Sequence, residues 1–521
     1  MFDFSSFKLS RNSNDFFVGI RKSALEDGYE FCLPNGFNDF PDGDFNEVRD
    51  LFFKMYRTFR KFERDNTGTN RFNLNRPDFQ QDQDQTTLSA GGVSMQTEDG
   101  EVCVLYSKIK MIERVLEAYD DLAINSIQKK ARRSEDIDYS QLYKYLDRAI
   151  YLDNGVIYVE AMDLPRPTVR YESTDIVNLY CYILDEIVQQ LDGDVPDNIQ
   201  AHSQDIRFLA QRFQDGYLTS NQSIFDKDTF GETISILKEA LDNIDKNTYY
   251  KDADYWGLYE AIETFLYGEI NPDQNDGDYW GIKGFSLVWE DMCSTYFFKK
   301  DPDNICYADT DIPLKDPPNP EPQRQGEEPK RVGNHRANYG NYGYGNKWIY
   351  WVKSDIRYPN SRNKDDFFGW NELLCIEFDT AESRTQAYSN RTHDKLENRD
   401  RRTAMRRFPR PDLVLKRKTQ NGFELRILDY KDVPLDFYIN PSSSPNSKNK
   451  YNNDIIKQLT YEFALQQTHT VAESVFFIPW YYTAEPELEP LGETKQNPDM
   501  QGIKIFKANF FIIQKLYLEN S

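Results

Sequence analysis

The sequence has few residues suited to a disulfide framework or a zinc site. Its six cysteines are scattered without a C-x-x-C pair, and it contains four histidines. Zinc sites and disulfide-stapled folds need such residues at close spacing. The sequence also lacks an apolar run of membrane-spanning length, and its first residues show no basic start followed by an apolar stretch. We therefore expect a cytoplasmic protein with reduced thiols and no membrane association.

Positive charge and nucleotide-binding glycines are also scarce. The 63 Lys and Arg residues are outnumbered by 86 Asp and Glu residues, which gives a net charge of -23 at pH 7. No G-x-x-x-x-G-K-S/T loop for nucleotide phosphates is present in the sequence. An acidic chain is poorly suited to hold DNA phosphates unaided, and any nucleotide hydrolysis would have to come from a partner.

Apolar and aromatic residues, by contrast, are abundant. The 521 residues are 39% apolar and include 34 Tyr and 35 Phe, which is enough for two or three domains with cores of their own. The pattern along the chain predicts an α+β recognition or partner-binding module over 1–195 and a helical connector over 196–275. A third domain is predicted over 276–521, with a loop-rich insertion at about 300–400 where proline and glycine are frequent.

Two apolar runs in this third region carry the most informative polar residues. They lie at 410–415 and 426–432, contain Asp412, Asp429 and Lys431, and are separated by a loop with an Asn-Gly pair. Asn-Gly between apolar runs is a strong signal for a β-hairpin. Because alternate residues of a strand share a face, Asp429 and Lys431 are expected as neighbours, with Asp412 brought beside them. The two acids could chelate a divalent cation next to the lysine.

A purely structural hairpin is the alternative. Pro-Asp also occurs elsewhere, for example at 41–42 and 302–303, and an acid two residues before a lysine recurs as well. Charged residues are common on exposed strand faces, so the hairpin could lie at the surface with a salt bridge from Asp429 to Lys431. The setting favours a site, because here both elements lie in or beside β-like apolar runs.

Residues 453–465 predict an amphipathic helix after the hairpin. Asn453 or Asp454 is a good capping residue for its start. Gln458 and Tyr461 are three positions apart, so they share one face of this helix. An alternative role for this pair is a polar helix face next to a core aromatic residue.

Residues 284–297 predict a second helix with a broad apolar stripe. Glu290 interrupts that stripe, and a carboxylate inside an apolar helix needs a partner or a function. Residues 473–480 and 502–511 are predicted as strands. Together these elements predict an α/β C-terminal domain, a mixed sheet flanked by helices, behind an α+β N-terminal region.

The order of these motifs resembles that of the PD-(D/E)XK nuclease superfamily. It consists of a Trp-Glu helix, a Pro-Asp strand, an Asp-x-Lys strand and an Asp-Ile-x-Lys-Gln-x-x-Tyr helix. Within the superfamily the chain is most similar to the LlaJI-type restriction endonucleases, relatives of the McrC subunit of modification-dependent restriction systems. The resemblance runs from the helix of Glu290 to the end of the chain, and the segment 453–461 is its most specific part. It implies a restriction-endonuclease-like fold and magnesium-dependent cleavage of foreign DNA.

The resemblance also assigns a role to each polar residue of these motifs. One or two Mg²⁺ ions would be bound by Asp412, Asp429, the backbone carbonyl of Tyr430 and, directly or through water, Glu290. Lys431 would orient the attacking water and stabilise charge, and Gln458 and Tyr461 would support it. These roles agree with what phosphodiester hydrolysis needs, since acidic ligands that leave positions open let magnesium activate water and offset charge.

A basic segment precedes the first acid of this set. It predicts contacts to DNA phosphates by Arg402, Arg406, Arg407 and Arg410, whereas an ordinary solvated loop is the alternative. The expected partners are double-stranded DNA and a McrB-like nucleotide-hydrolysing motor, with a homodimer as a further possibility. Two other functions stay open, namely a DNA-repair or transposition nuclease of the same superfamily and a non-catalytic assembly or activating subunit.

Overall fold

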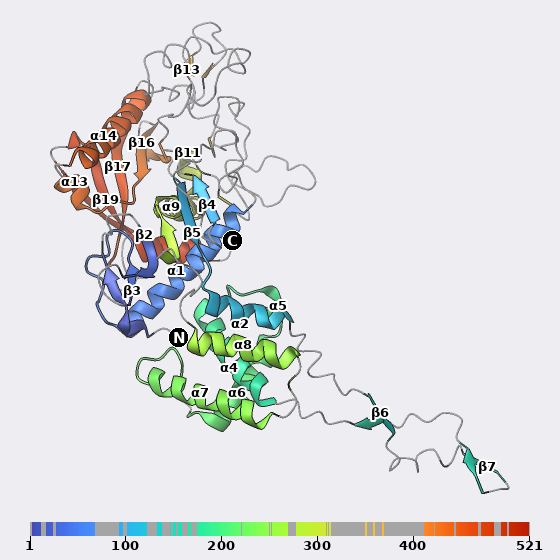
Figure 1. Ribbon diagram of the computed structural model, residues 1–521. Coiled ribbons are helices and arrows are strands. Elements are labelled where there is room, and N and C mark those ends of the chain that lie inside the picture. Colours follow the sequence, from blue (N-terminus) through green and yellow to red (C-terminus); the bar gives the residue numbers. More distant parts are fainter. Residues whose placement is uncertain are drawn as a thin grey trace, which may run out of the picture. The chain divides into compact units, whose positions relative to one another are not determined.

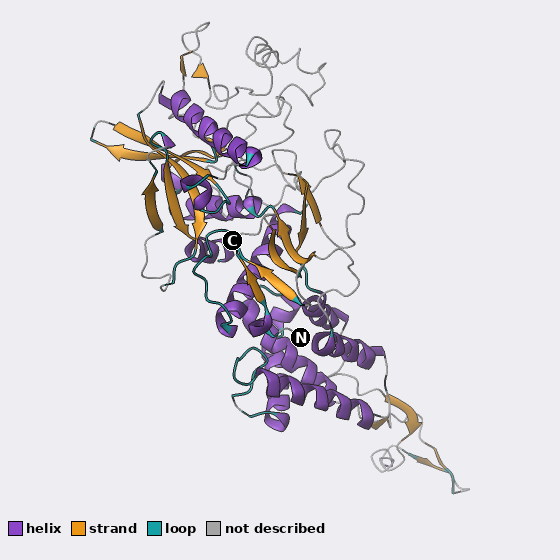
Figure 2. Ribbon diagram, turned by 60° about the vertical axis from the view of Figure 1, so that its left-hand side comes forward, coloured by secondary structure: helices purple, strands orange, loops and turns teal. Residues whose placement is uncertain are grey.

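The structure of the protein is a computed structural model, shown in Figures 1 and 2. Its described residues are 3–11, 17–23, 28–67, 93–96, 102–121, 133–137, 146, 149–152, 155–158, 165–167, 174–219, 221–248, 251, 253–268, 278–308, 310, 312–313, 350–351, 358–359, 367–368, 411–420, 422–441, 444–466, 470–483, 491–497 and 500–519.

The chain divides into two compact units. The larger unit comprises Phe4–Lys108 and Asp273–Ser521, and the smaller one comprises Met1–Asp3 and Ile109–Pro272. Helices and strands of both sheet types are mixed along the chain, which confirms the predicted α/β class. The two units do not coincide with the ranges 1–195, 196–275 and 276–521, because the first hundred residues belong to the same unit as the C-terminal part.

The first sheet of the larger unit joins residues far apart in the sequence. Its strands follow the spatial order β1 (Lys8–Ser10), β3 (Tyr29–Cys32), β2 (Phe17–Lys22), β10 (Asp278–Lys283), β5 (Val102–Tyr106) and β4 (Val93–Gln96). β1 and β3 are parallel, and the other neighbours pair antiparallel. Gly19 of β2 pairs with Gly281 of β10. A Cβ on Gly19 would lie 2.5 Å from the Gly281 Cα, so side chains there would force the strands apart.

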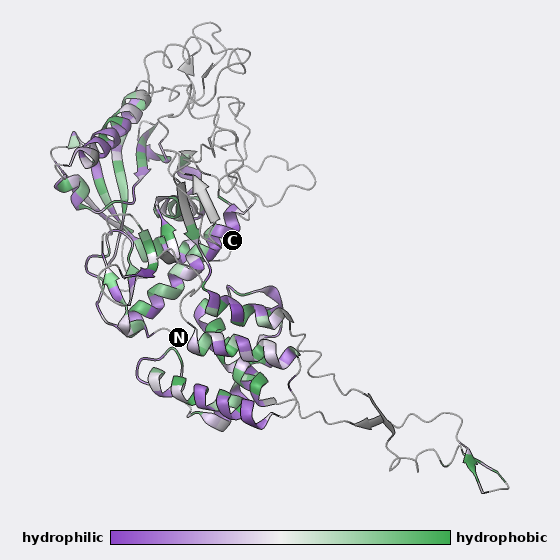
Figure 3. Cartoon of the chain, viewed as in Figure 1, coloured by the Kyte–Doolittle hydropathy of each residue, from purple (hydrophilic) through white to green (hydrophobic). Residues whose placement is uncertain are grey.

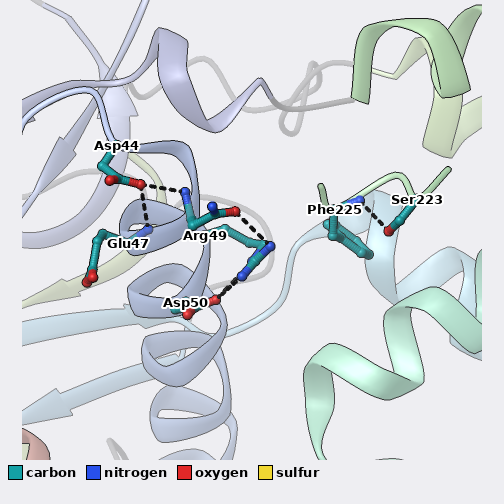
Figure 4. A network of polar contacts seen from close by, with 7 residues as sticks. Asp44, Glu47, Arg49, Asp50, Ser223 and Phe225 are labelled. Carbon is teal, nitrogen blue, oxygen red and sulfur yellow. Dashed lines mark hydrogen bonds and ion pairs between the residues drawn. The ribbon is translucent and has the colours of Figure 1, made fainter. Parts of the chain in front are cut away.

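Helix α1 (Phe45–Asn66) packs against this sheet through an amphipathic sequence. It begins after Asp44, whose side chain accepts hydrogen bonds from the N–H groups of Asn46 and Glu47 (Figure 4). Such a cap satisfies backbone donors that have no partner within the helix. Apolar and polar residues alternate along the helices of the chain in Figure 3, as expected for helices with one buried face.

Trp280 of β10 is the centre of the aromatic core under α1. Its side chain is fully buried, and its indole N–H donates to the carbonyl of Ser107. The rings that contact it come from β3 and α1 and belong to Phe31, Phe52, Tyr56 and Phe59. The N-terminal segment and β10 therefore share one core.

The second sheet of the larger unit contains the predicted hairpin. Its order is β12 (Tyr350–Trp351), β11 (Ile305–Ala308), β15 (Leu413–Thr419), β16 (Gly422–Tyr430), β17 (Val471–Trp480), β19 (Lys504–Asn509) and β18 (Gly492–Gln496). β15 and β16 pair antiparallel with Thr419 opposite Gly422, which confirms the hairpin. β16, β17 and β19 are parallel, whereas β11 and β18 pair antiparallel with their neighbours. A separate two-stranded ladder joins β13 (Tyr358–Pro359) and β14 (Phe367–Phe368).

Four helices accompany this sheet, namely α9 (Ser286–Lys300), α13 (Asp436–Ile439), α14 (Pro445–Gln466) and α15 (Phe510–Leu518). The helices predicted over 284–297 and 453–465 are confirmed by α9 and α14. The predicted cap at Asn453 or Asp454 is wrong, because α14 already begins at Pro445. The strand predicted over 502–511 ends at Asn509, whose side chain accepts from the Ile512 N–H and caps α15.

Helices pack on both faces of the second sheet. Phe476 of β17 stacks on Tyr438 of α13 and belongs to a core that also receives Ile455 and Leu459 of α14. The next residue, Phe477, faces the opposite way and contacts Trp289 and Phe297 of α9. The strand β17 is thus buried on both sides, as its continuous apolar run suggests.

The smaller unit is mostly helical. It contains α2 (Lys110–Asp121), α4 (Thr174–Leu191), α5 (Asp197–Ala201), α6 (Ser203–Tyr217), α7 (Phe230–Asn247) and α8 (Ala253–Tyr267), with the short strands β6 (Arg133–Ile137), β7 (Ile150–Tyr151), β8 (Ile157–Tyr158) and β9 (Pro165–Pro167). The hydroxyl of Tyr180 in α4 donates to the Val115 carbonyl of α2. None of the helices in the described part of the chain combines the length and apolar character that a membrane crossing requires.

Candidate functional site

The hairpin brings two carboxylates together where β15 begins and β16 ends. Leu413 pairs with Leu428, so the residues that continue this register, Asp412 and Asp429, are opposite each other. The backbone N–H of Tyr430 donates to Asp412 Oδ2 over 2.5 Å. This bond fixes Asp412 beside the second strand, and the predicted proximity of the two acids is present in the structure.

Lys431 follows directly after β16 and forms an ion pair with Asp429. Its Nζ lies 2.7 Å from Asp429 Oδ2. The Asp429 side chain is 4% exposed and that of Lys431 is 17% exposed, so the lysine reaches solvent whereas the acid does not. The hairpin lies inside the second sheet, between β11 and β17. The salt bridge of the structural alternative is therefore present, but at the buried end of the hairpin and not at its exposed tip.

The acids of the site outnumber its lysine. Burial, together with the nearby charges of Asp429 and Glu290, raises the pKa of Asp412 well above its ordinary value. Burial alone would lower the pKa of Lys431, but Asp429 and Asp454 outweigh it and raise that pKa. Neighbouring negative charges raise the pKa of a carboxyl group and so favour its protonated form. A cation bound between the acids would lower that pKa again. The electrostatics therefore favour a site that receives positive charge.

Glu290 lies on α9, on the other side of the sheet from α14. Its neighbour Trp289 is fully buried and donates from its indole N–H to the Phe477 carbonyl over 3.2 Å, which holds α9 on β17. Glu290 itself is half-buried. Its charge contributes to the raised pKa of Asp412, so α9 brings this carboxylate within electrostatic reach of the hairpin acids.

Helix α14 contributes Gln458 and Tyr461, and both side chains are buried. The Gln458 amide donates to the Ser474 hydroxyl of β17 over 2.9 Å. Its Oε1 atom is buried without a hydrogen-bond partner among the described residues. Gln458 thus holds α14 against the sheet on the side where Asp429 and Phe476 pair in register. The predicted support for Lys431 by these two residues stays a prediction.

Two acids of the site escaped the sequence reasoning. Asp454 of α14 was considered only as a cap, yet its Oδ1 atom lies 3.7 Å from Lys431 Nζ. The spacing of four residues between Asp454 and Gln458 was the available signal, because it places both on one helix face. Asp432 is buried beside Lys431, and its side chain and carbonyl accept from the Asn35 amide at 2.9 and 3.2 Å. No sequence pattern links residues so distant.

The segment around Asn35 is fitted closely to β17. The Tyr481 N–H donates to the carbonyl of Gly36 over 3.1 Å. Gly36 has φ +82°, and a Cβ there would lie 2.1 Å from the Pro479 carbonyl oxygen. Only glycine tolerates both the backbone angle and the close approach. The N-terminal segment therefore fixes the backbone directly after Lys431.

Asp432 is expected to make stability depend on pH. Burial raises its pKa to about 6, against the hydrogen bond from Asn35 and the charge of Lys450, which both lower it. The folded state then binds more protons than the unfolded state between about pH 4 and 6, so stability falls as pH rises through that window and is level above it. Asp432→Asn should remove this fall in stability, which is worth about 2–3 kcal/mol.

Melting temperatures of the wild type and of Asp432→Asn from pH 4 to 8 measure this pH dependence, with the exposed Asp436→Asn as control. Parallel profiles for wild type and Asp432→Asn would contradict the expectation.

The structure does not add a preformed metal-ligand group or the predicted DNA-binding arginines to the described site. Within the described residues, no group of three or more His, Cys, Asp or Glu side chains is arranged to hold a metal ion. Arg402, Arg406, Arg407 and Arg410 lie outside the described residues, as does most of the predicted insertion at 300–400. The site therefore consists of a carboxylate pair, a lysine and their neighbours.

Comparison with known proteins identified no relative of the chain. No protein-family model matches the chain, no curated protein matches it, and no solved structure matches it.

Proposed function

We propose that the protein is the magnesium-dependent endonuclease subunit of a restriction system, of the LlaJI-type and McrC-like kind. The observation that carries the proposal is the carboxylate pair of half-buried Asp412 and buried Asp429, beside a lysine that reaches solvent. A phosphodiesterase needs fixed acidic ligands for a cation and a positive group next to the scissile phosphate. The three side chains supply both from adjacent strands.

Charge supports the proposal over a purely structural ion pair. The carboxylates of Asp412, Asp429, Glu290 and Asp454 all act on one another or on the single ammonium of Lys431. A structural ion pair is favourable when the charges balance and each is hydrogen-bonded. Here the acids exceed the base, and Asp429 Oδ2 accepts no hydrogen bond of ordinary geometry among the described residues, although Lys431 Nζ is close. An excess of carboxylates, of which Asp429 and Asp454 are buried and Asp412 and Glu290 half-buried, suits a cation.

The order of the elements supports the same proposal. Along the chain α9, β11, β15, β16, α14 and β17 follow one another, and β11, β15, β16 and β17 are neighbours in that order in the sheet. The Trp-Glu helix, the Pro-Asp strand, the Asp-x-Lys strand and the Gln-Tyr helix thus follow in the order of the superfamily motifs, with the two helices on opposite faces of the sheet. The restriction-endonuclease-like fold is part of the proposal.

The residues present fit a magnesium ion in part. Asp412, Asp429 and the Tyr430 carbonyl would hold it, because hard cations take oxygen ligands and leave remaining positions to water. Glu290 would join directly or through water. When bound, the ion supplies an activated water and charge stabilisation at the phosphate. Lys431 would orient the attacking water and stabilise the charge that develops on the phosphate oxygens.

A DNA cleavage assay tests the proposal. Supercoiled plasmid is incubated with the protein and Mg²⁺, with EDTA as control, in the presence and absence of nucleotide and of a McrB-like motor subunit. Cleavage that requires Mg²⁺ supports the proposal. Absence of cleavage in every combination, with no binding of Mn²⁺ to the protein, would refute it.

The basic segment before β15 is proposed to bind DNA phosphates. Arg406→Glu together with Arg407→Glu is expected to weaken DNA association and to flatten its salt dependence, because each lost phosphate contact lowers the slope of log K against log salt by about 0.9. Fluorescence anisotropy with a DNA duplex at several salt concentrations measures the slope. An unchanged slope would favour the solvated-loop alternative for this segment.

The helical smaller unit is the proposed docking site of the motor subunit. It is inserted between β5 and β10, which are neighbours in one sheet, so it forms a module added to the unit that holds the site. It presents large apolar side chains to solvent, including Phe208 and Trp256. Exposed aromatic residues of this size are typical of protein interfaces. The acidic chain would then depend on its partner to hold DNA.

A further inference from the structure

Lys431 stands between two carboxylates that come from different elements. Its Nζ lies 2.7 Å from Asp429 Oδ2 at the end of β16 and 3.7 Å from Asp454 Oδ1 in α14. Both acids are nearly inaccessible to solvent. The Lys431 ammonium therefore has a second buried acid within ion-pair distance.

Asp454 is itself held in place by Tyr438. The Tyr438 hydroxyl donates to Asp454 Oδ2 over 3.0 Å, which leaves Oδ1 as the oxygen close to Lys431. The Tyr438 ring is fully buried and stacks on Phe476 with centroids 4.6 Å apart. Its carbonyl accepts from the Asn497 amide over 2.8 Å. Tyr438 is thus held by its ring stack and its backbone carbonyl, and its hydroxyl fixes Asp454 beside the lysine.

The second acid resolves a conflict at Asp429. An oxygen of Asp429 that binds a cation is no longer fully available to the Lys431 ammonium, and the two positive charges repel each other. A lysine with Asp429 as its single acceptor would lose its place when the cation binds. A lysine that also has a second acid within ion-pair distance keeps its place.

We infer that Asp454, fixed by Tyr438, is a positioning residue that anchors the Lys431 ammonium while Asp429 serves the cation. The inference rests on the proposed nuclease function. Asp454 and Tyr438 touch neither metal nor DNA in this arrangement, and they act through the lysine. Their removal should therefore change the rate of the chemical step and leave DNA binding unchanged.

Two variants of the full-length protein remove the anchor with little change in volume. Asp454→Asn removes the charge, and Tyr438→Phe removes the hydroxyl while keeping the ring on Phe476. Under conditions in which the wild type cleaves, kcat should fall on the order of 10²-fold for Asp454→Asn and on the order of 10-fold for Tyr438→Phe, with KM for DNA unchanged. Tyr482→Phe, which removes a hydroxyl bond to the Lys507 carbonyl in the larger unit, is the matched control and should keep the wild-type kcat.

A thermal double-variant cycle tests the anchor without any cleavage. Melting temperatures are measured for Lys431→Met, Asp454→Asn and the double variant. If the two side chains are paired, the double variant loses less than the two single losses added together. Additive losses would overturn the inference whether or not the protein cleaves DNA.

The outcomes separate the inference from the proposed function. Coupled melting temperatures with a selective loss of kcat in both variants support the anchor. Coupling with wild-type kcat in Asp454→Asn and Tyr438→Phe would overturn the positioning role. A wild-type protein that neither cleaves DNA nor binds Mn²⁺ removes the proposed function, and the thermal cycle then still decides whether Asp454 holds the lysine.

Discussion

Asp429→Asn and Lys431→Met are each expected to reduce magnesium-dependent cleavage by at least about 10²–10³-fold, the loss typical when one preorganised charge partner is removed. Asp429 would bind the cation, and Lys431 would stabilise charge on the phosphate. Asn keeps the shape of Asp429 but loses its charge, and Met keeps the length of the lysine stem. Plasmid cleavage with Mg²⁺ and the motor subunit measures the effect.

The fold should survive both replacements. Lys431 follows the buried end of β16 with a side chain that is 17% exposed, and both replacements conserve volume, so packing changes little. Asp436→Asn in α13 removes an exposed acid of the same segment and is the matched control for activity. Near wild-type cleavage by both Asp429→Asn and Lys431→Met would exclude this pair as the catalytic site.

The isolated fragment 273–521 is expected not to fold, whereas the chain with 109–272 replaced by a short linker should fold. In the fragment β10 loses both its neighbours, β2 and β5. Trp280 loses the rings of α1, and Phe510 loses its contact with Phe37. Each buried aromatic side chain contributes about 1.5–3 kcal/mol, so the combined loss is comparable with a whole domain's stability of about 5–15 kcal/mol.

The chain in which a short linker replaces 109–272 keeps all of these contacts. β5 and β10 are antiparallel neighbours with Leu105 opposite Ile282, so the chain leaves and re-enters the sheet at adjacent positions. Circular dichroism, a cooperative thermal transition and resistance to protease distinguish the two proteins. A cooperative transition for 273–521 alone would show that the N-terminal segment is dispensable for the fold.

The elements that the sequence predicted best are those with local signals. The Asn-Gly pair between apolar runs predicted the hairpin of β15 and β16, and the spacing of apolar residues predicted α9 and α14. Errors arose at boundaries, where local signals compete. Asp454 has the chemistry of a cap, yet α14 extends back to Pro445, because Tyr451 and Ile455 find apolar partners in the core beneath it.

The sequence by itself determined the residue types of the candidate site and the period that places Asp429 and Lys431 on one strand face. Tertiary structure alone decided what surrounds them. It placed β10 between β2 and β5, brought Asn35 to Asp432 across 397 positions, and set Asp454 beside Lys431. The physical reason is that strand periodicity acts between neighbours along the chain, whereas sheet order and buried polar pairs depend on which distant apolar faces pack together.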